Sequence, residues 1–127
     1  MNQAFSMTKE QYRNRTKTVT RRNGKMPPVG VDVFGIEKGQ GIPKGGHVVR
    51  MGIHRFISIR DEPLRRMIDE PMYGQAECIR EGFPNLTPDE FVKMYCKANN
   101  CTPDQIVHRG EFIYPYSPEE TERMIAK

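Results

Sequence analysis

A basic, threonine-rich run near the amino terminus holds the residues best suited to chemistry. Residues 13–22 contain five lysine or arginine residues and three threonines but no carboxylate. The stretch from Lys9 to Lys25 carries seven basic residues and one acidic residue, a local charge of +6, whereas the whole chain has a net charge of +4. Positive charge concentrated in this way predicts a phosphate-binding surface. A solvated basic face with no ligand is the competing interpretation.

The arginines of this run are suited to phosphate, because each guanidinium offers a forked set of hydrogen-bond donors. The predicted ligand-binding residues of the run are Arg13, Arg15, Lys17, Thr18, Thr20, Arg21 and Arg22. Phosphate contacts position a nucleic acid without reading its sequence, so selection of a base also needs a stacking surface. Phe83, Tyr73 and Tyr12 are the candidates for stacking. Phe83, which lies between a glycine and a proline, is also typical of a core anchor.

The composition predicts a single α+β domain spanning residues 1–127. Leucine occurs only twice, whereas isoleucine and valine together supply eighteen residues. Branched side chains of this kind favour pleated, half-buried surfaces, so the core is expected to consist largely of sheet. Ten prolines and eleven glycines indicate many turns between short elements, as a small barrel requires.

The cysteines and histidines indicate neither a disulfide framework nor a metal site. Cys78, Cys96 and Cys101 are odd in number and lack paired spacing, which is typical of a protein from a reducing cytosol. The three histidines are scattered along the chain. We therefore expect no metal or cofactor, no membrane span and a cytoplasmic location.

The first half of the chain is predicted to alternate strands with turns. Ala4–Met7 reads as a short strand, and the Thr8-to-Gln11 spacing is a capping-box pattern that predicts a helix over Lys9–Arg15. Val31–Lys38 reads as a strand, followed by a glycine- and proline-rich loop over Gly39–Gly46. His47–Arg60 gives the clearest alternation, interrupted at residues 55–56 in a way that predicts a bulge.

The second half adds helices around a last strand. Leu64–Glu70 is predicted to be a short helix or turn. A capping box that begins at Thr87 predicts a helix over Pro88–Asn99, with Phe91, Met94, Tyr95 and Ala98 on its buried face. Val107–Tyr114 reads as a core strand, and residues 115–127 as a peripheral terminal helix.

Four segments together resemble the ASCH (ASC-1 homology) domain family. They are, in sequence order, Lys17–Arg22, Glu77–Pro84, Thr87–Val92 and Val107–Phe112. The chain is similar to the small ASCH proteins of phage and bacterial genomes, which places it in a bacterial or phage-infected cell. The resemblance implies a PUA-like β-barrel with two or three short peripheral helices. It also implies RNA binding or, as in some small members, hydrolysis of acylated nucleosides such as N4-acetylcytidine; others are ribonucleases.

The resemblance also implies catalytic residues. Lys17 and Thr20 match the lysine and threonine of the acetylcytidine-hydrolysing members, and a family glutamate matches Glu81 best and Glu77 second. A threonine hydroxyl becomes nucleophilic when a base takes its proton, and a desolvated lysine can be that base. Arg21 or Arg22 could lower the pKa of Lys17 by like-charge repulsion, or they could equally leave it fully protonated in water.

These observations lead to one expectation with two alternatives. The chain is expected to bind RNA, a nucleotide or a modified base in a basic cleft, where Lys17 and a loop carrying Glu81 form opposite walls. The first alternative is a small amidohydrolase, in which Thr20 attacks, Lys17 is the base and Glu81 orients the substrate or shuttles the proton. The second is a phage protein that binds a host protein through its basic face. None of these requires a metal.

Overall fold

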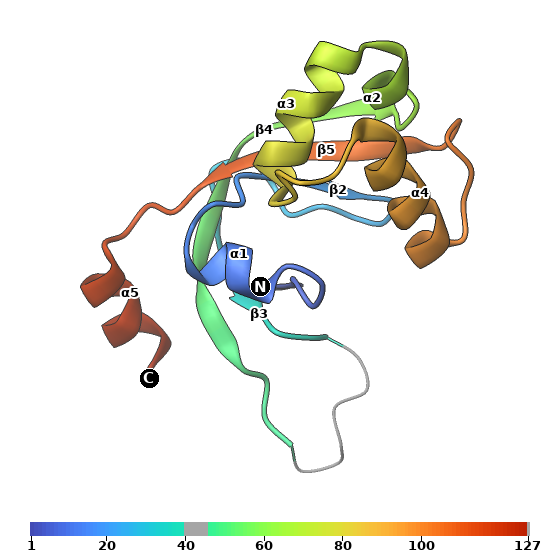
Figure 1. Cartoon of the computed structure of the whole chain (residues 1–127). Helices are drawn as coiled ribbons and strands as arrows, with labels where there is room; N and C mark the ends of the chain where they lie inside the picture. The colour runs from blue at the N-terminus through green and yellow to red at the C-terminus, as the bar shows by residue number, and fades with distance from the viewer. Residues whose placement is uncertain (40–45, 127) are drawn as a thin grey trace.

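The structure, a computed structural model, describes residues 1–39 and 46–126 and has an α+β fold, as predicted. Five strands form one mixed sheet in the order β1-β3-β4-β5-β2 (Figure 1). Only β1 and β3 pair in parallel. The strands are β1 (Asn2–Ala4), β2 (Val19–Arg22), β3 (Asp32–Ile36), β4 (Arg50–Pro63) and β5 (Ile106–Ile113).

The long strand β4 gives the sheet its curvature. Its first half pairs with β3 and its second half pairs with β5, and Arg55 lies at the changeover. The register against β5 slips between Phe56 and Ser58, which leaves Ile57 as the extra residue. A bulge of this kind bends a strand and increases its twist. The predicted bulge is therefore confirmed, displaced by about one residue.

The sheet remains open. β1 and β2 are its edge strands, and across residues 1–39 and 46–126 no ladder joins them, so the predicted closed barrel is not observed. Instead, the Arg22 Nη2 atom donates to the Ala4 carbonyl oxygen at 2.7 Å. One side chain thus bridges the two edges across a gap, which we call the seam. The strand predicted over Ala4–Met7 is also wrong, because the main chain turns there and Thr8 N donates to Phe5 O (3.1 Å).

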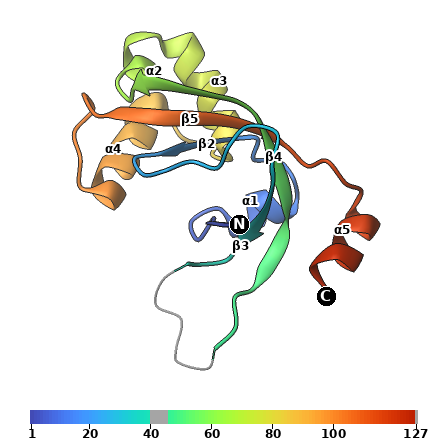
Figure 2. The same cartoon turned by 180° about the vertical axis from the view of Figure 1, so that it is seen from behind.

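In the described part of the chain, five helices surround the curved sheet. They are α1 (Lys9–Arg13), α2 (Arg66–Asp69), α3 (Pro71–Glu81), α4 (Pro88–Asn99) and α5 (Pro118–Ile125). Helices α2, α3 and α4 gather at the end of the sheet that contains β2 and β5, and α1 lies near the other end (Figures 1 and 2). Helix α5 lies apart from them and contacts β4. The predicted loop over Gly39–Gly46 falls mainly on residues 40–45, outside the described residues.

The helices test the capping patterns directly. The box at Thr87 is confirmed, because its side chain accepts from the Glu90 main-chain N–H and the Glu90 side chain accepts from the Thr87 main-chain N–H. Ser117 and Glu120 form the same pair of hydrogen bonds at the start of α5. The box at Thr8 is wrong: Thr8 makes no side-chain cap bond, and α1 ends at Arg13 rather than Arg15. Arg15 adopts a positive φ of 65°, which a continuing helix excludes.

Helix α3 was not predicted from the sequence. Glu77 and Glu81 lie on it, so the predicted glutamate loop is a helix. Gly74, in its middle, obscures the helical pattern because glycine is a poor helix former. The structure gives the reason for this glycine: a Cβ there would lie 1.9 Å from the Met67 carbonyl oxygen of α2. Close packing of two helices, rather than helix propensity, selects the residue.

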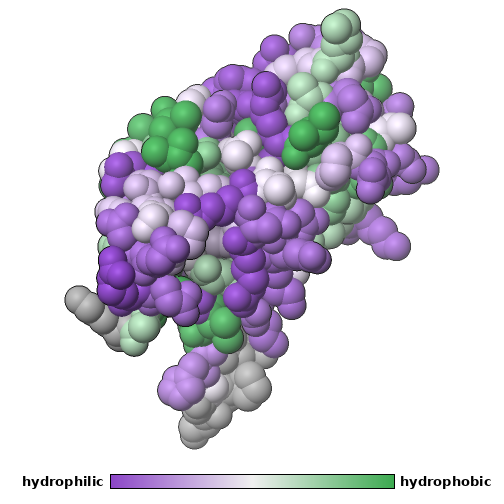
Figure 3. All heavy atoms as spheres, turned by 60° about the vertical axis from the view of Figure 1, so that its left-hand side comes forward, coloured by the Kyte–Doolittle hydropathy of each residue, from purple (hydrophilic) through white to green (hydrophobic). Residues whose placement is uncertain are grey.

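Two apolar clusters stabilise the fold. One joins α2, α3 and α4 to β5 through residues such as Met67, Cys78 and Phe91. The other lies against the curved sheet and contains Phe5, Tyr12, Met51, Phe56 and Phe112. On the face shown in Figure 3, hydrophilic residues dominate and hydrophobic ones form separate small patches.

Tyr12 belongs to this second cluster, so its prediction as a ligand-stacking residue is wrong. It is 1% exposed, stacks on Phe5 with ring centroids 4.5 Å apart, and its hydroxyl lies 2.9 Å from His54 Nδ1. His54 Nε2 in turn lies 2.8 Å from Gln3 Oε1. Burial lowers the pKa of His54 to about 3, so the ring is neutral. Because Gln3 Oε1 can only accept, Nε2 carries the ring proton and Nδ1 accepts the hydrogen bond from the Tyr12 hydroxyl.

Replacement of Gly35 by alanine is expected to destabilise the protein by about 2 kcal/mol, because overpacking a filled core forces neighbours to shift. A Cβ at Gly35 would lie 2.1 Å from Tyr12 Cζ. Urea unfolding measures the change. Gly24→Ala is the matched control, since a Cβ there has no atom within 4 Å. Equal stability of the two variants would contradict the proposed packing of Tyr12 on Gly35.

Candidate functional site

A pocket of about 250 Å³ opens at the seam between the edges of the sheet. Its wall comes from the segment after β1, from β2 and the residues before it, from the end of α3, and from α4. The lining residues are Ala4, Phe5, Ser6, Met7, Thr8, Lys17, Thr20, Arg21, Arg22, Glu81, Phe83, Phe91, Met94, Tyr95, Ala98 and Asn99. All three predicted catalytic residues thus reach one cavity, as the sequence analysis expected.

Lys17 and Glu81 form a buried pair in this pocket, although 64 positions separate them. The Lys17 Nζ atom donates to Glu81 Oε1 at 2.9 Å and to the Glu81 carbonyl oxygen at 2.8 Å. Both side chains are only 4% exposed. Burial lowers the pKa of Lys17, Glu81 opposes this effect, and the nearby charges of Arg22 and Arg21 add to it.

Arg22 and Thr20 form the neighbouring part of the wall. Arg22 Nε donates to Thr20 Oγ1 at 3.0 Å, and the guanidinium lies 4.9 Å from the ring centre of Phe5. Burial lowers the pKa of Arg22, although an arginine remains charged at any physiological pH. Within the described part of the chain, no carboxylate lies within 4 Å of Arg22. Arg22 is therefore a pocket cation without a direct ion-pair partner among these residues, and the charge of Glu81 acts on it only from a longer distance.

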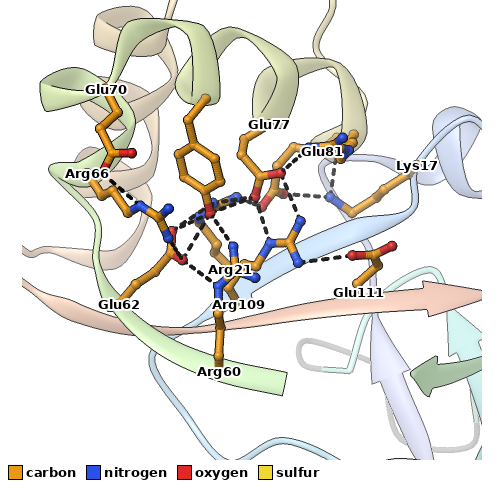
Figure 4. Close-up of polar contacts among 12 residues, drawn as sticks. Lys17, Arg21, Arg60, Glu62, Arg66, Glu70, Glu77, Glu81, Arg109 and Glu111 are labelled. Carbon is orange, nitrogen blue, oxygen red and sulfur yellow. Dashed lines mark hydrogen bonds and ion pairs between the residues drawn. The ribbon is translucent and has the colours of Figure 1, made fainter. Parts of the chain in front are cut away.

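Arg21 points away from any external phosphate, which corrects its prediction as a phosphate ligand. Its guanidinium is wholly buried. Nη1 donates to Glu81 Oε2 at 3.0 Å, and Nη2 donates to Glu77 Oε1 at 2.6 Å and to Glu62 Oε2 at 3.1 Å (Figure 4). Three carboxylates surround one arginine, so its two terminal nitrogens serve the interior, whereas its buried Nε has no hydrogen-bond partner among the described residues.

Glu77 also lies in this network rather than in the pocket, so its prediction as a ligand-binding residue is wrong. Its side chain is fully buried, and Arg109 donates a hydrogen bond to each of its carboxylate oxygens, at 2.7 and 2.9 Å. Arg80 donates a further hydrogen bond at 2.9 Å. Burial alone would raise the pKa of Glu77, but the hydrogen bonds from Arg109 and the charge of Arg21 lower it to about 2.

Tyr73 belongs to the same network, which corrects its prediction as a stacking residue. Its hydroxyl lies 2.8 and 2.9 Å from the Glu62 carboxylate oxygens. The guanidinium of Arg66 lies 4.0 Å from its ring centre. Glu62 and Arg109 were not predicted as site residues, since each lies on a strand whose alternation alone does not reveal a buried ion pair.

Three further residues of the basic run lie outside the pocket. Arg13 pairs with Glu37 at 2.8 Å, and the Arg15 guanidinium lies 5.3 Å from the ring centre of Tyr114. Thr18 N donates to the Arg80 carbonyl oxygen at 2.8 Å, and no side-chain contact places it in the cavity. The run therefore does not form one basic patch, because its side chains diverge from a helix, a turn and a strand.

The apolar wall of the pocket was largely missed as a binding surface. Phe91, Met94, Tyr95 and Ala98 were predicted as the buried face of α4, and Phe91 and Tyr95 are buried. The same face of α4 also lines the cavity. The helical spacing of these four residues is therefore the sequence signal that could have revealed the pocket wall. Phe83 also lines the cavity, and its ring centre lies 5.9 Å from that of Phe91. Phe83 is therefore both an anchor of the core and part of the pocket wall.

The described residues contain no group of three or more His, Cys, Asp or Glu side chains placed to hold a metal ion. None of the helices there is long and apolar enough to cross a bilayer. The fold and the site together define a small α+β protein with a pocket at the seam of an open sheet and an internal ion-pair network behind it.

The comparisons with known proteins provide information about the fold alone. No family model matches the chain, and no curated protein sequence matches it. Among solved structures, it is similar to the crystal structure of protein EF3133 from Enterococcus faecalis V583, which is described under the family name DUF984. The TM-score is 0.52 and the identity 13%, over 86% of this chain and 67% of that chain.

Glu77→Gln is expected to destabilise the protein by about 3 kcal/mol, because it removes the charge that compensates two buried arginines. The folded-state pKa of Glu77 lies below its usual value of 4.5, so its stabilising effect is complete above that pH and disappears as the pH falls through about 2. Chemical unfolding between pH 7 and pH 3 is the measurement.

The control is Glu111→Gln, since Glu111 is 41% exposed and contacts Arg109 through a single bridge. Its expected cost is below about 0.5 kcal/mol. The variant Glu77→Gln is also expected to lose less stability in acid than the wild type. An unchanged acid response would show that Glu77 is not the titrating group.

Proposed function

We propose that the protein binds a pyrimidine nucleoside or nucleotide, with the base inserted in the seam pocket beside Lys17 and Glu81. The observation that carries the proposal is the convergence of Lys17, Thr20, Arg22 and Glu81 in one small cavity. The aromatic side chains of Phe83 and Tyr95 line the same cavity. Polar groups on one side and aromatic rings on the other suit a flat heterocycle with polar edges.

The geometry favours a small ligand over a long nucleic acid. The predicted phosphate-binding arginines do not share a surface: Arg21 is internal, and Arg13 and Arg15 lie outside the pocket. Arg22 is the cation left to meet a phosphate or carbonyl oxygen of a ligand in the cavity. This arrangement is compatible with the proposed ASCH relationship and PUA-like ancestry, which rest on the motif resemblance and on an open, strongly curved sheet.

Calorimetric titration with uridine, cytidine and their monophosphates tests the proposal. Lys17→Met is expected to weaken binding by at least about tenfold, because it removes a donor in the pocket and leaves the Glu81 carboxylate with one partner fewer. Lys25→Met is the matched control, since Lys25 is exposed and outside the pocket. Circular dichroism checks that both variants fold. Equal affinities of the two variants would contradict a ligand beside Lys17.

Salt dependence separates a nucleotide pocket from an RNA-binding face. A nucleotide that meets one cation is expected to show a shallow dependence of affinity on salt, whereas a strand held through several phosphates shows a steep one. Titration of a short single-stranded RNA at two salt concentrations provides the comparison. Tight RNA binding with a steep salt slope would favour a basic face over the pocket.

Hydrolysis of an acylated pyrimidine is the second candidate, favoured by the lowered pKa of Lys17 in the same cavity as Thr20. In this reaction the Thr20 hydroxyl attacks the acyl carbonyl carbon, and neutral Lys17 takes its proton. Lys17 then returns the proton to the departing amine nitrogen, and water releases the acyl group from Thr20. Arg22, which donates to Thr20 Oγ1, stabilises negative charge on that oxygen.

Chromatographic assay of N4-acetylcytidine tests this reaction. Turnover is expected to rise with pH through the lowered pKa of Lys17, because only the neutral amine acts as the base. Thr20→Val and Lys17→Met are each expected to reduce turnover by at least about 100-fold. The surface variant Thr16→Val is the control, since Thr16 is exposed. Retained turnover in Thr20→Val would exclude Thr20 as the nucleophile.

A further inference from the structure

The main chain of Arg21, rather than its side chain, faces the pocket. The residue as a whole is 4% exposed, whereas its side chain is 0% exposed. The small exposed part is therefore main chain. Arg21 nevertheless lines the cavity, so a ligand there meets its main-chain atoms.

The register of β2 against β5 shows which way these main-chain groups point. Phe112 N donates to Thr18 O at 2.9 Å, and the pairing sets Thr20 opposite Gly110 and Arg21 opposite Arg109. Hydrogen bonds in an antiparallel pair involve every second residue of a strand. The ladder therefore uses Thr18, Thr20 and Arg22, and the N–H and C=O groups of Arg21 point away from β5.

Side chains on both faces of β2 lead to the same conclusion. Lys17 and Arg21 turn toward Glu81 on α3, whereas Arg22 turns toward Phe5 and Ala4. Lys17 and Glu81, on one face, and Arg22, Phe5 and Ala4, on the other, line one cavity. A cavity lined from both faces of a strand lies across the edge of that strand.

This edge has no strand partner in the described part of the chain, because β2 ends the sheet. Outside the ladders, no hydrogen bond among residues 1–39 and 46–126 involves the N–H or C=O of Arg21. Across the seam, the Ala4 carbonyl already accepts from Arg22. Main-chain polar groups are satisfied in almost every buried position, so a donor and an acceptor open to a pocket are ready for a ligand.

We infer that the edge of β2 at Arg21 recognises the ligand through main-chain hydrogen bonds, as it would pair with a further strand. The N–H and C=O of one edge residue point in the same direction, and they complement a flat group in which a donor stands beside an acceptor. Uracil and cytosine both present such an edge at N3 and C4. This inference rests on the proposed binding function and adds its selectivity: pyrimidines with a free N3 edge bind, and those blocked at N3 do not.

Titration of isotope-labelled protein with three nucleosides tests the inference by nuclear magnetic resonance. Uridine is expected to shift the Arg21 amide proton downfield, because that proton gains an acceptor. The Thr20 amide is the internal control, since it already pairs with Gly110. N3-methyluridine is expected to bind at least about tenfold more weakly, which corresponds to the loss of one hydrogen bond and its buried partner.

5-Methyluridine is the matched ligand control, because it carries the same extra methyl group away from the N3 edge. It is expected to bind as uridine does and to produce the same Arg21 shift. Equal binding of N3-methyluridine, or binding without a shift at Arg21, would overturn the edge pairing and leave the proposed nucleoside binding intact. No binding by any of the three nucleosides would overturn both.

Discussion

The carboxylate of Glu81, shared between Lys17 and Arg21, is the interaction on which the site depends. One oxygen accepts from Lys17 and the other from Arg21, and Arg21 is held in turn by Glu77 and Glu62. An isolated buried charge is costly, so each of these groups is stable in the interior only because the others are present. The network fixes the end of α3 against β2 and thereby fixes the pocket wall. The same arrangement engages both Glu81 oxygens, which favours a role in positioning Lys17 over one as a proton carrier.

The open sheet explains where the pocket lies. A closed barrel would satisfy the edges of β1 and β2 with each other and leave no main-chain group free. Here the two edges approach each other, and across residues 1–39 and 46–126 the Arg22 side chain, rather than a strand ladder, joins them. The curvature that brings them close comes from β4, whose two halves pair with different strands around the bulge at Ile57. The pocket is thus a consequence of a sheet that curls without closing, and α4 supplies the apolar wall that covers the gap.

The apolar clusters on either side of the seam separate stability from function. Met67, Cys78 and Phe91 hold α2, α3 and α4 together, and Tyr12 packs against Gly35 in the other cluster. Between them lie the polar residues of the pocket, where Lys17 is held at a lowered pKa by burial. The Lys17 side chain is only 4% exposed, so its amine is largely removed from water. That desolvation is what makes either ligand recognition or base catalysis chemically reasonable at this position.

The sequence by itself determined the elements whose signals are local. The capping box at Thr87 and the bulged strand β4 depend on neighbours within a few residues, and they were predicted correctly, although residues 51–54 of β4 are buried on both faces rather than alternating. The motif resemblance also predicted that Lys17, Thr20 and Glu81 share one site. Only the tertiary structure decided that Arg21 and Glu77 face inward, that Arg13 and Arg15 lie elsewhere, and that Gly74 belongs to a helix. A charged residue looks the same in a sequence whether it is paired in the core or exposed on the surface. Its role is set by long-range ion pairs, and those exist only when distant segments pack together.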